Sequence, residues 1–207
     1  MSLDKILEIA GLLIGLLYLF WEFKADRRMW VASLAMTCIS LYVYWRAGLY
    51  ADFGINVYYL LAAVYGWLLW SFGMKRENKS AELPITRVPL RWWGGLAVTF
   101  AAVYAVITWI LLHWTNSTVP YWDALNTSLS IVAMWMMARK WVEQWLVWLA
   151  VDAVSVGLYI YKGIEFYAVL YAVYTVAAYL GYRHWLKKMK VEYGGFAARR
   201  FPFYLSR

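Results

Sequence analysis

A polar and aromatic face recurs along residues 141–159. Trp145, Trp148, Asp152, Ser155 and Tyr159 follow one another at intervals of three or four residues. Intervals of this kind place all five side chains on one face of an α-helix. A carboxylate next to two indoles suits a ligand that brings a cation or hydrogen-bond donors, because aromatic rings attract delocalised cations. The alternative is that Asp152 is protonated and hydrogen-bonded to a neighbouring hydroxyl.

Apolar segments long enough to cross a bilayer make up most of the sequence. Of the 207 residues, 64% are hydrophobic and 15% are charged, whereas a soluble domain has about a quarter charged residues. The apolar residues fall into runs of about 20, the length of a transmembrane helix. A segment within lipid must satisfy its own backbone hydrogen bonds, so each run is expected to be helical. The sequence predicts an all-α polytopic membrane protein with seven transmembrane helices over residues 6–22, 29–45, 53–72, 92–112, 121–138, 142–161 and 166–185.

The lysines and arginines are distributed unevenly between the two sides of this predicted bundle. One set of loops together with the C-terminal tail holds 17 of the 20. Cytoplasmic loops carry the excess of these residues, so the N-terminus is expected outside and the C-terminus in the cytoplasm of a bacterial inner membrane. The net charge of +8 then reflects orientation and contact with anionic lipid headgroups rather than nucleic-acid binding.

The second half of the chain repeats the first. With a shift of 115 residues and no gap, Trp30 aligns with Trp145, Gly66 with Gly181, and many other Ser, Ala and Tyr pairs align as well. Three helices reverse the chain direction and a fourth restores it, so both copies are expected to point the same way, as in transporters with parallel repeats. The alternative is a repeat that only builds a stable bundle. The predicted parts are the first copy (1–74), a cytoplasmic linker and joining helix (75–115), the second copy (116–190) and a basic cytoplasmic tail (191–207).

Residues on four further helices complete the predicted substrate site. Thr37 stands in the first copy where Asp152 stands in the second, so polar faces from both copies are expected to line a shared cavity. The other candidates are Asn56, Tyr59, Asn126, Tyr171 and Tyr174. Tyrosines also serve as interfacial anchors, and hydroxyl residues in membrane helices often only pack or bond to the backbone.

Several chemistries are excluded. His113 and His184 are expected on opposite sides of the membrane, and Cys38 is the single cysteine, so no metal site and no disulfide within the chain are predicted. The sequence has no glycine-rich phosphate loop and no second catalytic group near Asp152. We therefore predict no enzymatic activity and no cofactor. A membrane sensor that binds a ligand without transporting it is the rival class, and the sequence leaves open whether the chain forms a homo-oligomer.

Several segments resemble the PnuC-type vitamin transporters and their thiamine-transporting PnuT relatives over nearly the whole chain. The resemblance rests on Y-W-D-A-L from Tyr121, A-R-K from Ala138, W-L-V-W from Trp145, and S-V-G-L-Y-I-Y-K-G from Ser155. N-V-Y-Y from Asn56 and Y-G-W-L-L-W from Tyr65 are similar to the third core helix of that family.

The resemblance implies a three-plus-one-plus-three fold related to the SWEET sugar transporters. It also implies that Trp145 and Trp148 bind the substrate, and that a vitamin enters by facilitated diffusion and is trapped by phosphorylation. Asp152 and Met134 stand where nicotinamide riboside carriers tend to have Asn and Gln. A carboxylate can pair with the aminopyrimidine of thiamine, and indoles suit its thiazolium cation. Thiamine is therefore the preferred substrate at this level, with nicotinamide riboside second.

Overall fold

The computed structural model describes residues 14–48, 50–73 and 83–200, except for the side chains of residues 47, 50–52, 166 and 192–200. The chain forms two compact units, Met1–Leu83 and Pro84–Arg207. Within the described residues, the regular structure is helical apart from one isolated bridge between Thr86 and Trp141. The predicted all-α class is therefore confirmed.

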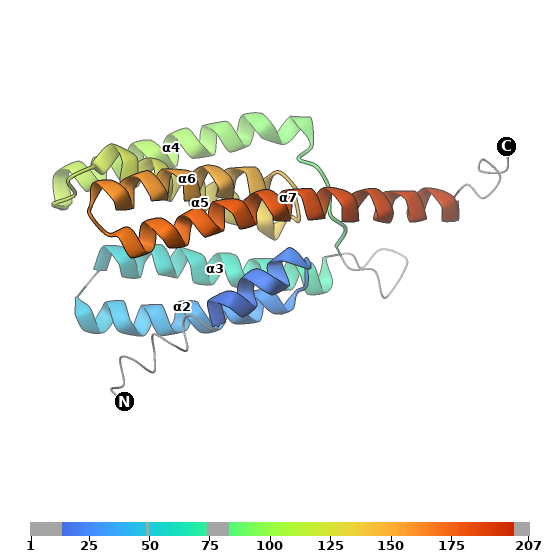
Figure 1. The fold of residues 1–207 in the computed structure, drawn as a ribbon, viewed down its shortest axis with the longest axis horizontal. Helices are drawn as coiled ribbons and strands as arrows, with labels where there is room; N and C mark the ends of the chain where they lie inside the picture. The colour runs from blue at the N-terminus through green and yellow to red at the C-terminus, as the bar shows by residue number, and fades with distance from the viewer. Residues whose placement is uncertain (1–13, 49, 74–82, 201–207) are drawn as a thin grey trace. The chain divides into compact units, whose positions relative to one another are not determined.

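The first unit contains three helical segments. A segment over Ile14–Phe23 is followed by α2 (Arg28–Ala47) and α3 (Tyr50–Phe72). The helices α2 and α3 pack side by side along their lengths (Figure 1). Gly48 ends α2 with φ 70°, and its amide donates to the carbonyls of the last turn, as a glycine in the left-handed conformation commonly does.

The second unit contains α4 (Leu90–Trp114), α5 (Pro120–Ala138), α6 (Gln144–Tyr161) and α7 (Glu165–Arg200). Each helix packs against the next in the chain, so α5 lies against α4 and α6, and α6 lies against α5 and α7. Pro120 occupies the first turn of α5, where its missing N–H leaves no intrahelical hydrogen bond unmade. These pairings place α6 between α5 and α7.

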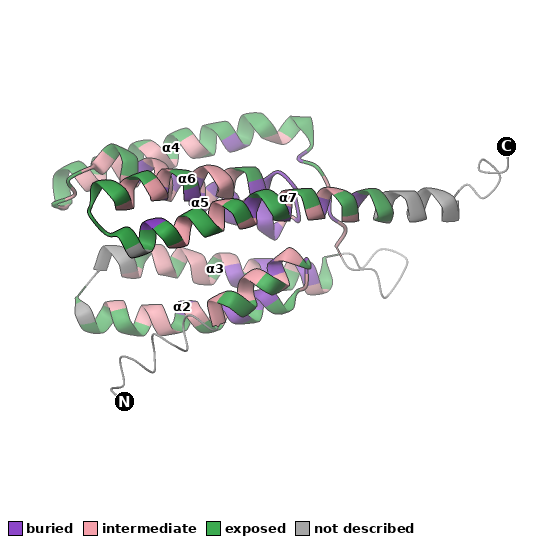
Figure 2. Ribbon diagram, viewed as in Figure 1, coloured by how far each residue is buried: buried purple, intermediate pink, exposed green. Residues whose placement is uncertain are grey.

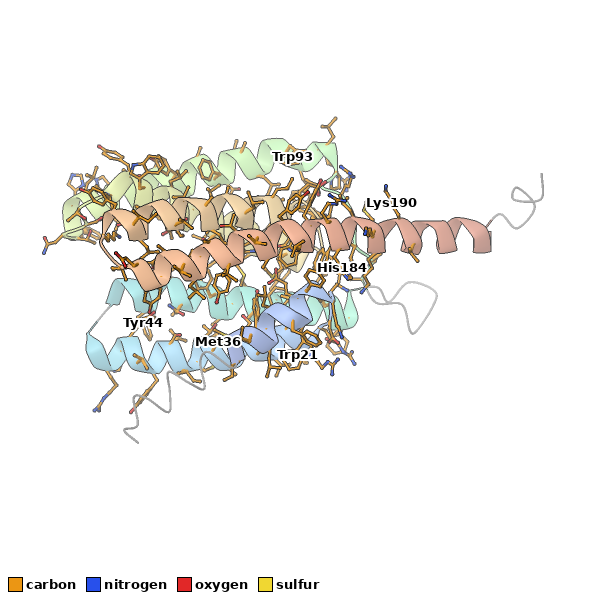
Figure 3. All side chains as sticks on the ribbon, in the orientation of Figure 1. Trp21, Met36, Tyr44, Trp93, His184 and Lys190 are labelled. Carbon is orange, nitrogen blue, oxygen red and sulfur yellow. The ribbon has the colours of Figure 1, made fainter. Side chains whose placement is uncertain are left out.

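The predicted helix limits agree with the structure to within three residues in most places. The exception is the seventh helix, which was expected to end at residue 185 but continues to Arg200 (Figure 1). Lys and Arg are good helix formers, so the charged stretch around His184 and Lys190 (Figure 3) changes the surroundings of α7 without breaking it. Residues 6–13 of the predicted first helix and 201–207 of the predicted tail lie outside the described residues.

Three of the described helices are long and apolar enough to cross a bilayer: Phe53–Phe72 within α3, α4 and α6. Leu96 is the single buried side chain of α4, and most of that helix is exposed (Figure 2). Trp93, for example, is 47% exposed and projects from α4 (Figure 3). Contact with lipid accounts for such an apolar, exposed surface. The full count of seven spans and the direction of the two copies remain predictions.

The duplication extends to the backbone conformation of the turns. Ala25 and Lys140, which are 115 residues apart, have φ 56° and 52° and lie in the turns before α2 and α6. Gly48 and Gly163 both have φ 70° and follow the ends of the same two helices. A non-glycine residue with positive φ is uncommon. Its recurrence at the same repeat position shows that each copy builds the same turn.

A tryptophan packed over a glycine joins the two helices of each pair. In the first unit Trp30 of α2 lies over Gly66 of α3, and its ring meets Trp70 edge to face at 5.5 Å and 90°. In the second unit Trp145, Gly181 and Trp185 make the same arrangement, with ring centroids 5.7 Å apart at 86°. Because lipid removes most of the hydrophobic drive for helix association, close packing at small residues has to hold such pairs together.

Substituting either glycine tests this contact. A Cβ at Gly181 would lie 2.7 Å from the Trp145 ring, so Gly181→Ala and its counterpart Gly66→Ala are expected to destabilise the protein by about 1–3 kcal/mol through overpacking. Thermal unfolding in detergent measures the effect. Gly157→Ala is the matched control, because a Cβ there meets nothing within 4 Å. Equal melting temperatures for Gly181→Ala and Gly157→Ala would contradict this account.

Candidate functional site

The predicted face of α6 divides into a packing end and a polar end. Trp145 is only 2% exposed, and its ring fills the space over Gly181 in α7. This is the same packing role that Trp30 has in the first unit. Trp148, one turn further on, is half-buried, and its indole N–H has no hydrogen-bond acceptor within the described part of the chain. The Trp145 indole N–H also has no acceptor in the described part of the chain, but its ring is packed on Gly181, so Trp148 is the more exposed of the two indoles.

Asp152 is buried near the middle of α6, with 7% of its surface exposed. Tyr171 and Tyr174 of α7 lie close enough to interact with it electrostatically. Among the described residues, no lysine or arginine forms a salt bridge with Asp152. A carboxylate at this depth without a cationic partner is costly, and such groups usually face a ligand pathway or another polar group.

Asn126 of α5 connects to the polar end of this face. Its side-chain amide donates to Ser155 Oγ across 3.0 Å, and Ser155 is fully buried. The Asn126 Oδ1 atom is also buried and accepts no hydrogen bond from the described residues. Met134, two turns further along α5, is buried and offers no strong polar group. The α5 contribution to the site is therefore an unsatisfied amide oxygen beside Ser155.

Tyrosines from α6 and α7 stack next to the carboxylate. Tyr159 stacks on Tyr167 and on Tyr171, with ring centroids 5.2 Å apart and planes inclined by 25° in both cases. Tyr171 in turn meets Tyr174 edge to face at 5.7 Å. These contacts join the predicted residues Tyr159, Tyr171 and Tyr174 into one aromatic wall. Tyr167 belongs to it as well, although the α6 face by itself does not indicate this residue.

The remaining candidates lie in the first unit. Thr37 of α2 is 6% exposed, nearly the same as its repeat counterpart Asp152 at 7%. Asn56 and Tyr59 lie on α3, both partly buried, and Tyr59 contacts the ring of Tyr58. The structure therefore buries Thr37 as deeply as Asp152, and a shared cavity between the copies remains a prediction.

Glu143 is the residue that the sequence did not indicate. It precedes α6, is 8% exposed, and accepts a hydrogen bond from the backbone N–H of Val88 across 2.9 Å. The contact joins residues 55 positions apart, so no local pattern could reveal it. The prolines at 84 and 89, which enclose a short extended segment, are the available signal.

The site contains no metal centre in the described residues, because no three side chains of His, Cys, Asp or Glu come together there. What it holds is a buried carboxylate, an indole N–H donor, an amide oxygen acceptor and a tyrosine wall, all on α5–α7. These groups can bind a polar aromatic solute. No nucleophile–base pair accompanies them among the described contacts.

A family model described as nicotinamide mononucleotide transporter matches residues 5–187. The chain belongs to this family. The expected membership of the PnuC-type transporters is thereby confirmed, and with it the prediction of a transmembrane vitamin transporter. That the chain is not an enzyme stays a prediction, and a family of transporters agrees with it.

Two curated relatives and one solved structure are similar to this chain. The nicotinamide riboside transporter PnuC of Escherichia coli is 26% identical over 208 residues, covering 89% of this chain and 86% of the relative. The riboflavin/roseoflavin transporter RibM of Streptomyces davaonensis is 29% identical over 182 residues, covering 86% and 83%. A crystal structure of the vitamin B3 transporter PnuC shares the fold, with a TM-score of 0.69 and 22% identity over 90% of this chain and 83% of that one.

The names of these relatives bear on the substrate. They refer to nicotinamide riboside, riboflavin or vitamin B3, and they give no support to the preference for thiamine. The family and the sequence both indicate transport of a small vitamin.

Removing the central ring of the tyrosine wall tests its contribution to the fold. Tyr159→Leu loses two stacked pairs, each worth about 0.5–1.5 kcal/mol beyond buried area, and is expected to lower the melting temperature in detergent by several degrees. Tyr159→Phe keeps the ring and should melt close to the parent protein. Tyr161→Leu is the control for a tyrosine that is 70% exposed. A Tyr159→Leu variant as stable as Tyr161→Leu would show that the stack is not structural.

Proposed function

We propose that this protein takes up a small cationic aromatic vitamin by facilitated diffusion, with nicotinamide riboside the first candidate and thiamine the second. The observation that carries the proposal is the buried carboxylate of Asp152 beside Trp148 and the tyrosine wall, without a cationic partner in the described residues. A solute with a delocalised positive charge offsets the burial of the carboxylate and stacks on aromatic rings.

Two unsatisfied atoms support a substrate that also carries hydroxyl or amino groups. The Trp148 indole N–H is a donor and Asn126 Oδ1 is an acceptor, and both are buried without partners in the described chain. Leaving such groups unpaired costs about 1–3 kcal/mol each. A polar solute that pairs with both would recover this free energy, so they are suited to select for a sugar or an aminopyrimidine.

The choice between the two vitamins depends on different observations. Nicotinamide riboside has a pyridinium cation and ribose hydroxyls, and it is the substrate in the name of the Escherichia coli relative. Thiamine is kept as the second candidate because the amino group of its pyrimidine can donate to a carboxylate such as Asp152. Riboflavin, named for the Streptomyces relative, is uncharged and offers nothing to offset the Asp152 charge.

The transport path follows from the same proposal. The N-terminus lies outside and the C-terminus in the cytoplasm, and the buried polar face of α6 that carries Asp152 lines the path. The vitamin moves down its gradient, and phosphorylation in the cell retains the product. Counterflow of labelled vitamin into proteoliposomes tests this step, because a sensor that binds without transport would give binding but no exchange.

The charge of Asp152 is the most direct test of the substrate class. Purified protein is expected to bind nicotinamide riboside or thiamine in preference to riboflavin. Asp152→Ala removes the carboxylate together with its hydrogen-bond acceptors, and it should weaken binding of the cationic vitamin at least about tenfold, which corresponds to 1.4 kcal/mol. Isothermal titration calorimetry measures both affinities. Glu165→Gln, at an exposed carboxylate in the first turn of α7, is the control.

The outcomes separate the alternatives. Preferential binding of riboflavin, or full affinity in Asp152→Ala, would overturn the proposed cationic substrate. Binding of thiamine but not of nicotinamide riboside would reverse the order of the two candidates while keeping the substrate class.

A further inference from the structure

A short extended segment, residues 84–89, lies against the turn between α5 and α6; we refer to it as the strap. The backbone N–H of Thr86 donates to Lys140 O across 3.1 Å, and the N–H of Val142 donates to Thr86 O across 2.9 Å. These two hydrogen bonds form the isolated parallel bridge between Thr86 and Trp141. The strap thus pairs with the residues immediately before α6.

Glu143, which directly precedes α6, binds the strap with its side chain. One carboxylate oxygen accepts from the N–H of Val88 at 2.9 Å, and the other lies 3.7 Å from the guanidinium of Arg87. The backbone carbonyl of Glu143 accepts from Leu146 and Val147, the first amides bonded within the helix. One residue therefore begins α6 with its main chain and holds the strap with its side chain.

The first copy shows that this turn does not need a strap for its shape. Arg28 occupies the repeat position of Glu143, and its guanidinium pairs with Asp26 at 2.6 Å. Asp26 also accepts from the Arg28 backbone N–H, and the Arg28 side chain holds the pKa of Asp26 below its usual range. The two turns nevertheless have the same backbone, with φ 56° at Ala25 and 52° at Lys140. The two copies therefore have the same turn with different side-chain contacts, a local ion pair in the first and the strap in the second.

The strap connects α6 to α4. Val88 belongs to a buried cluster with Leu96 of α4, Val132 and Met136 of α5, and Trp141 of the turn. The Arg139 guanidinium lies over the rings of Trp92, Trp135 and Trp141 at 5.2, 4.9 and 5.9 Å. The strap leads directly into Leu90, where α4 begins. Through Glu143, the start of α6 is therefore tied to the packed ends of α4 and α5.

We propose that Glu143 is a positioning residue: its bond to the strap sets the first turn of α6 and with it the place of Trp148 opposite α5. Trp148 lies five residues after Glu143 on a single uninterrupted helix. A shift of the first turn would move its indole N–H, and short polar contacts to a ligand tolerate little displacement. The expected effect of Glu143 on substrate affinity rests on the proposed function, whereas its expected effect on the first turn of α6 does not.

Hydrogen exchange of the substrate-free protein in detergent tests the effect on the helix. Glu143→Ala removes the acceptor of Val88 and is expected to speed amide exchange over residues 144–150 by about tenfold or more. Glu143→Gln keeps an oxygen that can accept from Val88 and should stay within about threefold of the parent. Arg87→Ala, which removes only the exposed partner of the ion pair, should also stay within that range. The repeat-equivalent residues 29–35 serve as an internal control and should not change.

Glu143→Asp is a second variant that keeps the test decisive if Glu143→Ala does not fold. It keeps the charge but shortens the side chain by one methylene group, so it should lose the Val88 contact and speed exchange over the same residues. Unchanged exchange in both Glu143→Ala and Glu143→Asp, or equal acceleration in Glu143→Gln, would overturn the positioning role.

Binding then tests the consequence for the substrate. Calorimetry with nicotinamide riboside and with thiamine is expected to show affinity weakened about tenfold in Glu143→Ala and retained within about threefold in Glu143→Gln. If the parent protein binds neither vitamin, the proposed function fails while the exchange data still decide the role of Glu143. If the parent binds and Glu143→Ala binds equally well, the positioning role fails and the proposed function stands.

Discussion

The packing of one tryptophan ring over one glycine in each copy is the contact on which the rest of the structure depends. Trp145 can lie over Gly181 only because that position has no side chain. The contact determines how closely α6 approaches α7, and a bilayer provides little hydrophobic force that could do so instead. Trp148 and Asp152 follow Trp145 by one and two turns, and the tyrosine wall spans the same helix pair. A change in the spacing of α6 and α7 would therefore displace the entire candidate site.

The same contact in both copies makes their differences informative. Trp30 and Trp145 pack alike, and Thr37 and Asp152 are buried to nearly the same extent. The two copies thus share this packing, with the hydroxyl of Thr37 at this position in the first and the carboxylate of Asp152 in the second. A buried hydroxyl can bond to its own helix backbone, whereas a carboxylate needs a donor or a cation. The requirement for an outside partner arises in the second copy alone at this position.

The sequence predicts what depends on local periodicity and fails where distant residues meet. The helices and the 115-residue register follow from apolar runs and from aligned Trp and Gly residues, because each helix satisfies its own backbone. The end of α7 was missed because a change from apolar to charged residues marks a change of surroundings rather than the end of a helix. The α6 face stays a prediction as a binding site, and periodicity could not distinguish Trp145, which packs on Gly181, from the half-buried Trp148.

The strap gives the turn before α6 contacts with residues that are distant in the sequence. In the first copy, an ion pair between residues two positions apart lies at this turn, where solvent screens it because the Arg28 side chain is exposed. In the second copy Trp141 and Glu143 stand at the positions of Asp26 and Arg28, so that pair cannot form. The hydrogen bond from Val88 to the buried Glu143 carboxylate belongs to a stronger class, worth about 1.5–3 kcal/mol. The turn before α6 is therefore held by a buried contact from a segment outside the repeat. Since the two turns share one backbone conformation, the additional contacts act on the position of α6 and not on the shape of the turn.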